Sequence, residues 1–400
     1  MPILAKIDNC CGCSACANKC AKGTISMLPN EEGFLHPVID VEKCVECGLC
    51  EEVCPGLSPA SASHDMKPFA VILQHKDDAV RYQSTSGGAF TAIAEEIIKR
   101  GGVVYGASLT SDLRVKHIGV SIIDDLSKFR NSKYVQSEIG DCYKGVKKSL
   151  IEGKLVCFSG TPCQINGLYK FLGRDYENLF TVDVVCKSVP SPLVFGKYVE
   201  YKKNQLGMAI SDIVFRDKKR GFLYCTMAHY YSHQDRMEAK SAYRRGSESD
   251  EWLRLFLSGK ISRRSCVTCN YQTVNRPGDF TLGDIWETGN AAFDDNKGST
   301  MVHVWTPKGK VFLEYIKDRV RILDYPIEES RGTERKHTLK IFPGREVLFA
   351  DAHNLTTKAF FNKYAPYSFK VRVKNYGRYL LWLLNIQSFV RHLKHKVIHR

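Results

Sequence analysis

Residues 10–20 read CCGCSACANKC and residues 44–55 read CVECGLCEEVCP. Both stretches space four cysteines as C-x2-C-x2-C-x3-C, and proline follows the last cysteine of the second run. This spacing is typical of chains that bind two [4Fe–4S] clusters, in which each run gives three thiolates to one cluster and its fourth to the other. The two runs therefore hold each other, and they predict the fold of the N-terminal region.

The exchange of the fourth thiolate assigns eight of the nine cysteines in residues 10–54. The first cluster takes Cys10, Cys13, Cys16 and Cys54. The second cluster takes Cys44, Cys47, Cys50 and Cys20. Cys11 stays outside both sets on this count. Residues 23–27 and 34–39 read as short strands around a turn at 30–33, which predicts the hairpin of a two-cluster bacterial ferredoxin.

Two other uses of these cysteines fit the pattern less well. Structural zinc sites favour separate CxxC pairs, and the spacing here is a poor match to them. A disulfide framework needs an oxidising compartment, and residues 1–9 lack the cationic region and apolar core of a secretory signal. We therefore expect a cytoplasmic protein with metal-bound thiolates. Ala21 follows Cys20 where ferredoxin runs normally have proline, a change that could loosen the turn without removing a ligand.

The chain is too long for a ferredoxin alone. Its 400 residues, 44% hydrophobic and 25% charged, are typical of a soluble protein with two or three domains. Residues 56–63 are small and include proline, which predicts a linker. We expect a ferredoxin domain over residues 1–60, an α/β domain over residues 66–345, and a basic helical tail over residues 346–400.

The net charge of +15 is distributed unevenly. Residues 341–400 hold 11 Lys and Arg against two acidic residues, whereas residues 1–60 hold four basic and eight acidic residues. A basic tail could contact nucleic acid, anionic lipid or an acidic protein, or it could be a solvated surface. No zinc-finger or helix-turn-helix signature accompanies it, so we expect no nucleic acid partner.

The tail also contains apolar residues among its Arg and Lys residues, mainly between 376 and 397. Their run is shorter than the ~20 residues that a membrane-spanning helix needs. This pattern predicts either weak contact with an anionic membrane surface or packing on the protein's own core.

Strands and helices alternate after the linker. Apolar runs predict strands at 69–73, 102–109, 115–123, 155–159 and 180–186. Helical spacing of apolar residues predicts helices at 87–99, 138–152 and 164–172. This alternation indicates an α/β core behind the α+β ferredoxin module. Beyond residue 211 the predicted strands, 213–216 and 222–231, are more polar and leave the topology open.

Two segments place glycine and hydroxyl side chains at a predicted helix start. Residues 84–88 read STSGG and precede a helix, and residues 158–164 read FSGTPCQ between a strand and a helix. Free amides at a helix start can hold an anion such as phosphate, and helix capping by Ser or Thr is the alternative. The candidate binding residues are Thr85, Ser86, Gly87, Gly88, Gly160 and Thr161.

Four dispersed cysteines could form a further metal site. Cys163 opens a predicted helix, where the dipole stabilises a thiolate. Cys186 ends a predicted strand, and Cys266 and Cys269 form a CxxC pair. Because strand ends gather at one edge of an α/β sheet, these four could bind a third cluster, with structural zinc or a dithiol pair as alternatives. The remaining cysteines read as core residues: Cys142, Cys157 and Cys225.

Residues 130–137, RNSKYVQS, are dense in hydrogen-bonding side chains. Lys133 in this segment could neutralise a reduced cofactor or a phosphate, or it could be a solvated loop lysine. Residues 276–286 read as an alternating strand with the carboxylates Asp279 and Asp284, which could contact a ligand or belong to turns. The candidate catalytic residues are Lys133, Lys187 and Asp284.

Together these segments resemble the coenzyme F420 hydrogenase/dehydrogenase beta-subunit family, in the form with an N-terminal two-cluster ferredoxin. The matching pieces are TSGG at 85–88, SKYVQS at 132–137, GTPCQ at 160–164, and a CxxC pair followed by TLGDIW at 281–286. The similarity covers residues 1–325.

The resemblance implies that the central domain binds FAD beside an iron–sulfur cluster. The segments that match its flavin-lining positions contain Ser86, Gly87, Gly88, Ser132, Lys133, Tyr134, Gly160 and Thr161. This chain has Lys187 where the family often has histidine and Ser188 where it often has glycine. These two differences lie on the face expected for the substrate.

We therefore expect an iron–sulfur flavoenzyme that moves electrons between its [4Fe–4S] clusters and FAD, and to or from an organic substrate or a deazaflavin- or nicotinamide-type coenzyme. The alternative is a non-catalytic subunit that delivers electrons to a partner enzyme. Similar proteins also suggest a link to the biosynthesis of surface polysaccharides. Either interpretation implies a redox partner protein or coenzyme.

Overall fold

The computed structural model of the protein describes residues 1–59, 66–233, 236–241, 250–272, 276–331, 339–384 and 386–387.

The N-terminal module contains two short helices and a hairpin. The elements of the module are α1 (Ala15–Lys19), β1 (Ile25–Pro29), β2 (Leu35–Ile39) and α2 (Leu49–Glu52). β1 and β2 pair antiparallel, from Ile25 opposite Ile39 to Pro29 opposite Leu35, which confirms the predicted hairpin.

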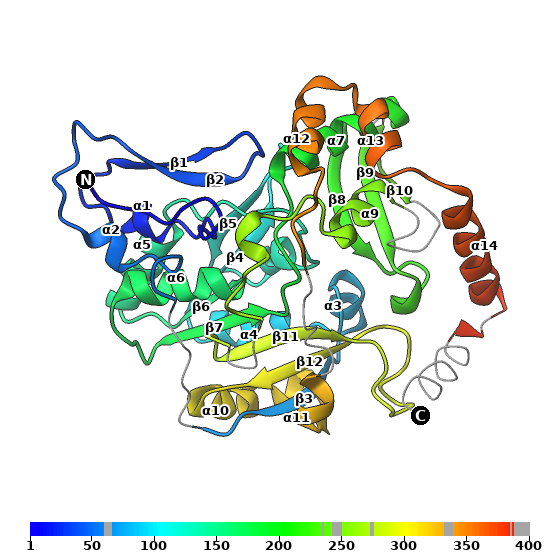
Figure 1. The fold of residues 1–400 in the computed structure, drawn as a ribbon. Helices are drawn as coiled ribbons and strands as arrows, with labels where there is room; N and C mark the ends of the chain where they lie inside the picture. Colours follow the sequence, from blue (N-terminus) through cyan, green and yellow to red (C-terminus); the bar gives the residue numbers. More distant parts are fainter. Residues whose placement is uncertain are drawn as a thin grey trace.

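The centre of the protein is a large mixed sheet (Figure 1). Its order within the described residues is β13-β3-β12-β11-β7-β6-β4-β5. The bounds are β3 (Phe69–His75), β4 (Val103–Leu109), β5 (Val115–Val120), β6 (Val156–Gly160), β7 (Leu179–Val184), β11 (Phe280–Ile285), β12 (Ser299–Val304) and β13 (Val320–Tyr325).

Most strands of this sheet run parallel. β4, β6, β7 and β11 pair parallel in that order, and β12 pairs antiparallel with both β11 and β3. β3 therefore runs in the same direction as β11. The carboxyl ends of β3, β11, β7, β6 and β4 lie at one edge of the sheet, where open α/β sheets bind their ligands.

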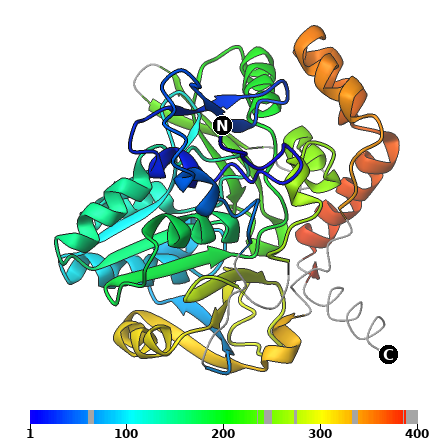
Figure 2. The same ribbon diagram turned by 60° about the vertical axis from the view of Figure 1, so that its left-hand side comes forward.

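Helices cover both faces of the large sheet. The bounds are α3 (Asp78–Gln83), α4 (Ala89–Lys99), η1 (Asp124–Phe129), α5 (Cys142–Ile151), α6 (Pro162–Leu172), α10 (Pro307–Ile316), η4 (Lys317–Arg319) and α11 (Ile327–Arg331). α4 and α10 bury Ile93, Ile97 and Phe312 against one face. α5 and α6 pack on the other face, and their core also takes in Cys13 and Val53 of the N-terminal module. Figure 2 shows this module lying over these helices.

A second layer of strands and helices stands beside the large sheet. The bounds of its elements are α7 (Pro192–Leu206), β8 (Ile210–Asp217), η2 (Phe222–Tyr224), β9 (Thr226–His233), β10 (Arg236–Ser241), α9 (Glu251–Ser258), η3 (Arg264–Cys266), α12 (Arg345–Asn354), α13 (Thr357–Tyr364) and α14 (Phe369–Leu383). β8, β9 and β10 form an antiparallel sheet. α12 and α13 pack into the same core as α7, so these parts of the predicted tail are integral to this layer.

The tip of the β1–β2 hairpin fastens the N-terminal module to this layer (Figure 1). Glu32 accepts hydrogen bonds from Nε and Nη2 of Arg345, at 2.6 and 2.5 Å, in a largely buried ion pair. Ser191 donates to the Glu32 carbonyl at 2.5 Å, and Phe34 enters the core of the second layer. Breaking a buried ion pair by removing one partner typically costs about 3–5 kcal/mol.

The predicted combination of an α+β module with an α/β domain is confirmed, and several element bounds differ. The strand expected at 115–123 ends at Val120, and the helix expected at 138–152 begins at Cys142. The strand expected at 180–186 ends at Val184, so Cys186 lies in the following loop. The strand expected at 222–231 begins at Thr226, because Gly221 at φ +86° leads into a 3-10 turn. Part of the predicted linker and residues 388–400 of the predicted tail lie outside the described residues.

A buried histidine in the second layer predicts acid sensitivity. His229 Nε2 lies 2.8 Å from the Tyr198 hydroxyl, which donates to Asp250 at 2.7 Å. Burial lowers the pKa of His229 to about 4. An unfolded histidine binds its proton near pH 6.5, so between pH 6.5 and 4 the unfolded chain holds more protons and stability falls as the pH falls.

We expect His229→Gln to lose less stability than the parent protein between pH 7 and 5, by about 2 kcal/mol. The free energy of unfolding at the two pH values, measured without oxygen, checks this. His353→Gln, at an exposed position of α12, is the control and should keep the parent's pH dependence. An unchanged pH dependence in His229→Gln would contradict the assignment.

Candidate functional site

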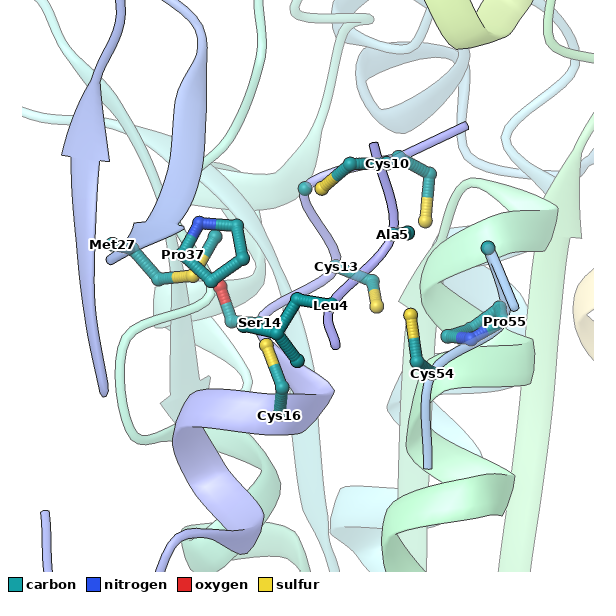
Figure 3. Close-up of a pocket in the computed structure, with 13 residues that line it drawn as sticks. Leu4, Ala5, Cys10, Cys13, Ser14, Cys16, Met27, Pro37, Cys54 and Pro55 are labelled. Atoms are coloured by element: carbon teal, nitrogen blue, oxygen red, sulfur yellow. The ribbon is translucent and has the colours of Figure 1, made fainter. Parts of the chain in front are cut away.

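The first cysteine run and Cys54 line one pocket. Cys10, Cys13, Cys16 and Cys54 contribute to its wall, and these are the four thiols that the spacing assigns to the first cluster. Figure 3 shows the thiols of Cys13 and Cys54 pointing toward each other, with Cys10 and Cys16 on either side. The rest of the wall is largely apolar and includes Leu4, Ala5, Met27, Pro37 and Pro55. Such a wall limits the access of solvent, which is one determinant of cluster potential.

Thiols in the described part of the chain surround space rather than converge on a point. No group of three His, Cys, Asp or Glu side chains among the described residues is placed to hold one metal ion. A [4Fe–4S] cluster is held by thiolates that stand around it, as the four thiols stand around the first pocket.

Gly12 lets the first cysteine loop approach its surroundings closely. Its φ of +69° is a conformation that favours glycine. A Cβ atom at this position would lie 2.5 Å from Gln136 Nε2 and 2.8 Å from Arg263 Nη1. The loop therefore needs glycine both for its turn and for contact with these two side chains.

The second cysteine set lies closer to solvent. Cys47 is exposed, Cys20 and Cys44 are half-buried, and Cys50 is buried. Cys50 packs in one apolar cluster with Cys16 of the first set. The Cys20 thiol accepts a hydrogen bond from the Thr24 backbone at 3.4 Å.

The four dispersed cysteines come together between the two layers. Cys163 opens α6, Cys186 follows β7, and Cys266 and Cys269 lie at and after η3. The Cys186 thiol is near enough to the other three that their charges raise its pKa, after burial as the main cause. Burial likewise raises the pKa of Cys266 to about 12. Metal binding would have to displace these protons, because only thiolates act as ligands.

Cys11 connects the two cysteine sets. Its thiol contacts both Cys13 and Cys163. The contact with Cys13 and burial hold the pKa of Cys11 well above the usual range, whereas the contact with Cys163 lowers it. The spacing alone left Cys11 outside the clusters. The structure places it between the first ferredoxin site and the four dispersed cysteines, which we call the inner cysteines. The predicted third cluster would therefore lie next to the first.

The segments expected to bind the flavin meet at the carboxyl edge of the large sheet. Thr85 Oγ1 lies 2.9 Å from Ser132 Oγ and accepts from the Ser132 backbone at 2.7 Å. Gln164 Nε2, in the first turn of α6, donates to Ser137 Oγ at 3.0 Å. Hydrogen bonds thus join the 84–88, 130–137 and 158–164 segments into one edge.

Gly87 uses its backbone for the sheet. Its N–H donates to Thr300 Oγ1 at 2.8 Å, and its carbonyl accepts from the His75 N–H at 2.7 Å. The position requires glycine because the backbone of the sheet packs closely against it. A Cβ here would lie 2.2 Å from the Leu73 carbonyl oxygen. Gly88, at φ +86°, begins α4, and that helix has no side-chain cap. Anion binding at this segment would therefore depend on the first turn of α4 rather than on the Gly87 amide.

Arg216 is a functional candidate that sequence reasoning missed. It is buried at the end of β8, and its Nη1 donates to Asp284 Oδ2 at 2.8 Å and to the Tyr134 hydroxyl at 3.3 Å. The guanidinium lies 5.0 Å from the centre of the Trp286 ring. Its Nη2 is buried and has no hydrogen-bond partner among the described residues. A signal was present in the sequence, because a cation follows the apolar alternation of Ile213 and Phe215.

Lys218 was also missed, and it fastens the Ser86 segment. Its ammonium donates to the carbonyl oxygens of Ser86 and Lys297 at 2.8 Å each, and to that of Arg81. Burial, together with the charges of Arg81 and Arg216, lowers the pKa of Lys218 to about 7.

The predicted catalytic residues are all held by other parts of the protein. Lys133 donates to two carbonyl oxygens at and after the end of η1, at 2.8 Å each, and burial of its ammonium lowers its pKa to about 7. Lys187 donates to the Leu257 carbonyl at 2.5 Å. Asp284 accepts from Ser86 Oγ as well as from Arg216. Their catalytic roles stay predictions.

The other acids and cysteines singled out in the sequence have structural contacts. Asp279 is buried and accepts from the Thr181 backbone at 2.8 Å and from Thr306 Oγ1 at 2.7 Å. Cys157 and Cys225 are buried as expected, and Cys225 accepts from Arg216 Nε at 2.9 Å. Cys142 is half-buried and contacts the His117 carbonyl.

Family comparisons match both parts of the chain. Residues 9–56 match the 4Fe-4S dicluster domain, and residues 153–330 match the family described as the C terminus of the coenzyme F420 hydrogenase/dehydrogenase beta subunit. The chain therefore carries a two-cluster ferredoxin-type domain followed by a domain of the F420 hydrogenase/dehydrogenase beta-subunit family. The match of residues 9–56 indicates an N-terminal domain that binds iron–sulfur clusters.

Individual relatives cover parts of the chain. An uncharacterized protein of Methanocaldococcus jannaschii is 27% identical over 207 residues, covering 43% of this chain and 55% of that protein. The coenzyme F420-dependent sulfite reductase of the same organism is 28% identical over 167 residues, covering 40% of this chain and 25% of the reductase. The chain thus spans about half or less of these two relatives.

Among solved structures, a chain of the F420-reducing [NiFe] hydrogenase complex from Methanosarcina barkeri is similar, with a TM-score of 0.44 and 17% sequence identity. The match covers 78% of this chain and 96% of that chain.

The ligand assignment can be tested with two cysteine variants. We expect Cys54→Ala to lose about four iron atoms per chain, because it removes the fourth thiolate of the first cluster. Cys11→Ala should keep the iron content of the parent protein, because Cys11 lies between the sites without a ligand role. Iron and sulfide analysis after purification without oxygen measures both. A loss of about four irons in Cys11→Ala would instead make Cys11 a ligand.

Proposed function

We propose that the chain is an iron–sulfur flavoprotein oxidoreductase. It moves electrons between [4Fe–4S] clusters and FAD, and to or from an organic substrate or a deazaflavin- or nicotinamide-type coenzyme. The observation that carries this proposal is the continuous row of thiols from the surface to the carboxyl edge of the large sheet. It begins at the exposed Cys47 and ends at Cys163, beside the segment that contains Gly160 and Thr161.

Each step in this row is supported by a contact. Cys50 of the second set packs with Cys16 of the first. The charges of Cys10 and Cys54 act on the Cys16 thiol, whose pKa burial raises to about 12. Cys11 then joins the first set to Cys163. Three clusters held by these sets would form a chain of neighbouring centres.

The carboxyl edge has features that fit an anionic flavin nucleotide. In the part of the chain that the structure describes, the Arg216 Nη2 is buried without a hydrogen-bond partner, and the first turn of α4 has no side-chain cap. Both would bind a phosphate or another anionic group of FAD. Bound FAD supplies the exchange of hydride with an organic partner and of single electrons with a cluster. Asp284 and Tyr134 orient Arg216, and Lys218 holds the Ser86 segment in place.

A redox partner would reach the clusters through the N-terminal module. Cys47 is exposed, and residues 1–60 carry eight acidic against four basic residues. This favours docking of a protein or coenzyme with basic groups near the second cluster. The related sulfite reductase depends, by its name, on coenzyme F420, which makes this deazaflavin the first coenzyme to test.

The exposed Cys47 also favours a second function, a subunit that delivers electrons to a separate catalytic enzyme. The purified chain distinguishes the two interpretations when it is mixed with reduced deazaflavin, reduced nicotinamides or reduced ferredoxin. Bleaching of the flavin by a coenzyme supports the oxidoreductase. Reduction by ferredoxin alone, without reaction with any coenzyme, supports the delivery subunit.

Cofactor content provides the direct test of the proposal. We expect about twelve irons and one FAD per chain after purification without oxygen. Arg216→Met should bind FAD at least about tenfold more weakly, because it removes a buried charged donor, while its iron content stays unchanged. Arg321→Met is the matched control. Arg321 lies in β13, at the far edge of the sheet, where its Nη1 donates to Gln74 Oε1 at 2.9 Å. A parent protein that contains no flavin would contradict the proposed flavoenzyme. A content of only eight irons per chain would contradict the proposed inner cluster.

We also propose that α14 contacts an anionic membrane surface. Among the described residues, no helix is long and apolar enough to cross a bilayer. α14 instead exposes one apolar face at helical spacing, with Phe369 82%, Val373 55% and Tyr376 65% exposed. Residues 369–387 contain four Lys and Arg and no acidic residue. Basic amphipathic helices of this kind lie in the interface of anionic membranes.

Vesicle flotation tests this surface in the full-length chain. We expect the parent protein to float with vesicles that contain phosphatidylserine and to stay below with vesicles of phosphatidylcholine alone. Replacing Phe369, Val373 and Tyr376 together by serine should abolish flotation. Serine at the exposed Ile122, Ile123 and Ile151 is the control and should leave it unchanged. Equal flotation of both triple variants would contradict the proposed contact between α14 and the membrane.

A further inference from the structure

A guanidinium lies buried between the first cluster site and the inner cysteines. Arg263 is 1% exposed. Its Nε donates to the Cys10 carbonyl at 2.6 Å, and its Nη2 donates to the Leu35 carbonyl at 2.9 Å. The same Nη2 lies 3.6 Å from the Cys10 thiol. Arg263 therefore contacts a predicted ligand of the first cluster directly, although 253 residues separate it from Cys10.

Arg263 also faces the inner cysteines. It directly precedes η3, which ends at Cys266. Its charge acts on the thiols of both Cys266 and Cys163 and favours their thiolate forms. One cation thus acts on two separate sets of candidate ligands.

No carboxylate in the described part of the chain balances this charge. Arg263 contacts two carbonyl oxygens, the Cys10 thiol, the His36 ring 3.0 Å away, and the Phe34 ring, whose centre lies 5.3 Å from the guanidinium. The neighbouring Arg264, by contrast, pairs with Glu32 at 3.4 Å. A buried cation without a counter-charge is costly, and proteins normally pair such a group. The missing negative charge must come from the thiolates around it.

One nitrogen of the guanidinium still has a hydrogen bond to give. Within the described part of the chain, Arg263 Nη1 is buried without a hydrogen-bond partner, and so is Gln136 Nε2. Both lie close to Gly12, where a Cβ would be 2.8 and 2.5 Å away from them. Two donors without acceptors therefore stand at the loop that carries Cys10 and Cys13. Cluster sulfur atoms accept hydrogen bonds of this kind, and such bonds tune the reduction potential.

We propose that Arg263 is the shared counter-cation of the first ferredoxin cluster and the inner cluster, and that it sets the reduction potentials of both. This inference rests on the proposed function, since it requires [4Fe–4S] clusters at both sites. Reduction adds one electron and thus one negative charge to a cluster, and no bond forms or breaks. A fixed neighbouring cation stabilises the reduced form and raises the potential.

The consequence for the second cluster is different. None of the contacts of Arg263 involves Cys20, Cys44, Cys47 or Cys50. Arg263 thus raises the potentials of the first ferredoxin cluster and the inner cluster relative to the potential of the second ferredoxin cluster. Arg263 is a positioning and tuning residue, because it contacts cluster ligands rather than a substrate.

The test compares three variants of the full-length protein, purified without oxygen: Arg263→Gln, Arg263→Lys and Arg264→Gln. Iron and sulfide analysis reports cluster content, and a redox titration followed by electron paramagnetic resonance reports the potential of each cluster. We expect Arg263→Gln to shift two clusters to more negative potentials and to leave the third unchanged. Arg263→Lys, which keeps the charge, should remain near the parent values. Arg264→Gln should match the parent throughout.

Three results would overturn the inference. Full iron content in Arg263→Gln with all three potentials unchanged removes the tuning role. If Arg263→Gln loses iron, Arg263→Lys decides: recovery of iron and potentials supports the counter-cation, and failure of both overturns it. A shift confined to one cluster overturns the shared role. Failure of the proposed function is distinguishable, because the parent protein would then itself lack the inner cluster or FAD.

Discussion

The close contact between the first cysteine loop and α6 is the constraint on which the rest of the site depends. Gly167 in α6 leaves room for Cys13, since a Cβ there would lie 2.9 Å from the Cys13 thiol. Gly12 likewise lets the loop pack closely against the side chains of Gln136 and Arg263. Electrons pass between centres only over short distances. The two glycines therefore decide whether the ferredoxin module and the inner cysteines act as one path or as two separate domains.

Distant contacts hold this arrangement in place. The hairpin tip is fixed by the ion pair of Glu32 with Arg345, which joins residues 313 positions apart. Phe34 extends the same attachment into the core of the second layer. The N-terminal module is thus anchored at two places, by its cysteine loop on α6 and by its hairpin near α12. A module held at both ends keeps its clusters at a fixed position relative to the sheet.

The sequence was sufficient where the deciding pattern is local. Regular cysteine spacing located the ferredoxin-type domain and the four thiols of the first pocket, and alternating apolar runs located the parallel strands. It was insufficient for Arg263, Arg216 and Lys218, because their importance comes from burial and from contacts with distant residues. A charged residue in a loop or at a strand end normally reads as solvated. Gly87 shows the opposite case. Its sequence context suggested a phosphate site, but its backbone N–H donates to Thr300 in the large sheet.

These buried cations give the path an electrostatic direction. The outer module is acidic, with eight acidic and four basic residues in residues 1–60. Farther inside, Arg263 has no carboxylate partner among the described residues, and Lys218 is bound by carbonyl oxygens alone. Arg216 pairs with Asp284, and its Nη2 has no hydrogen-bond partner within the described ranges. Added negative charge is therefore more favourable at the inner centres than at the surface. The clusters and flavin that we propose would accept electrons more readily toward the carboxyl edge of the sheet, where the chemistry with a substrate would take place.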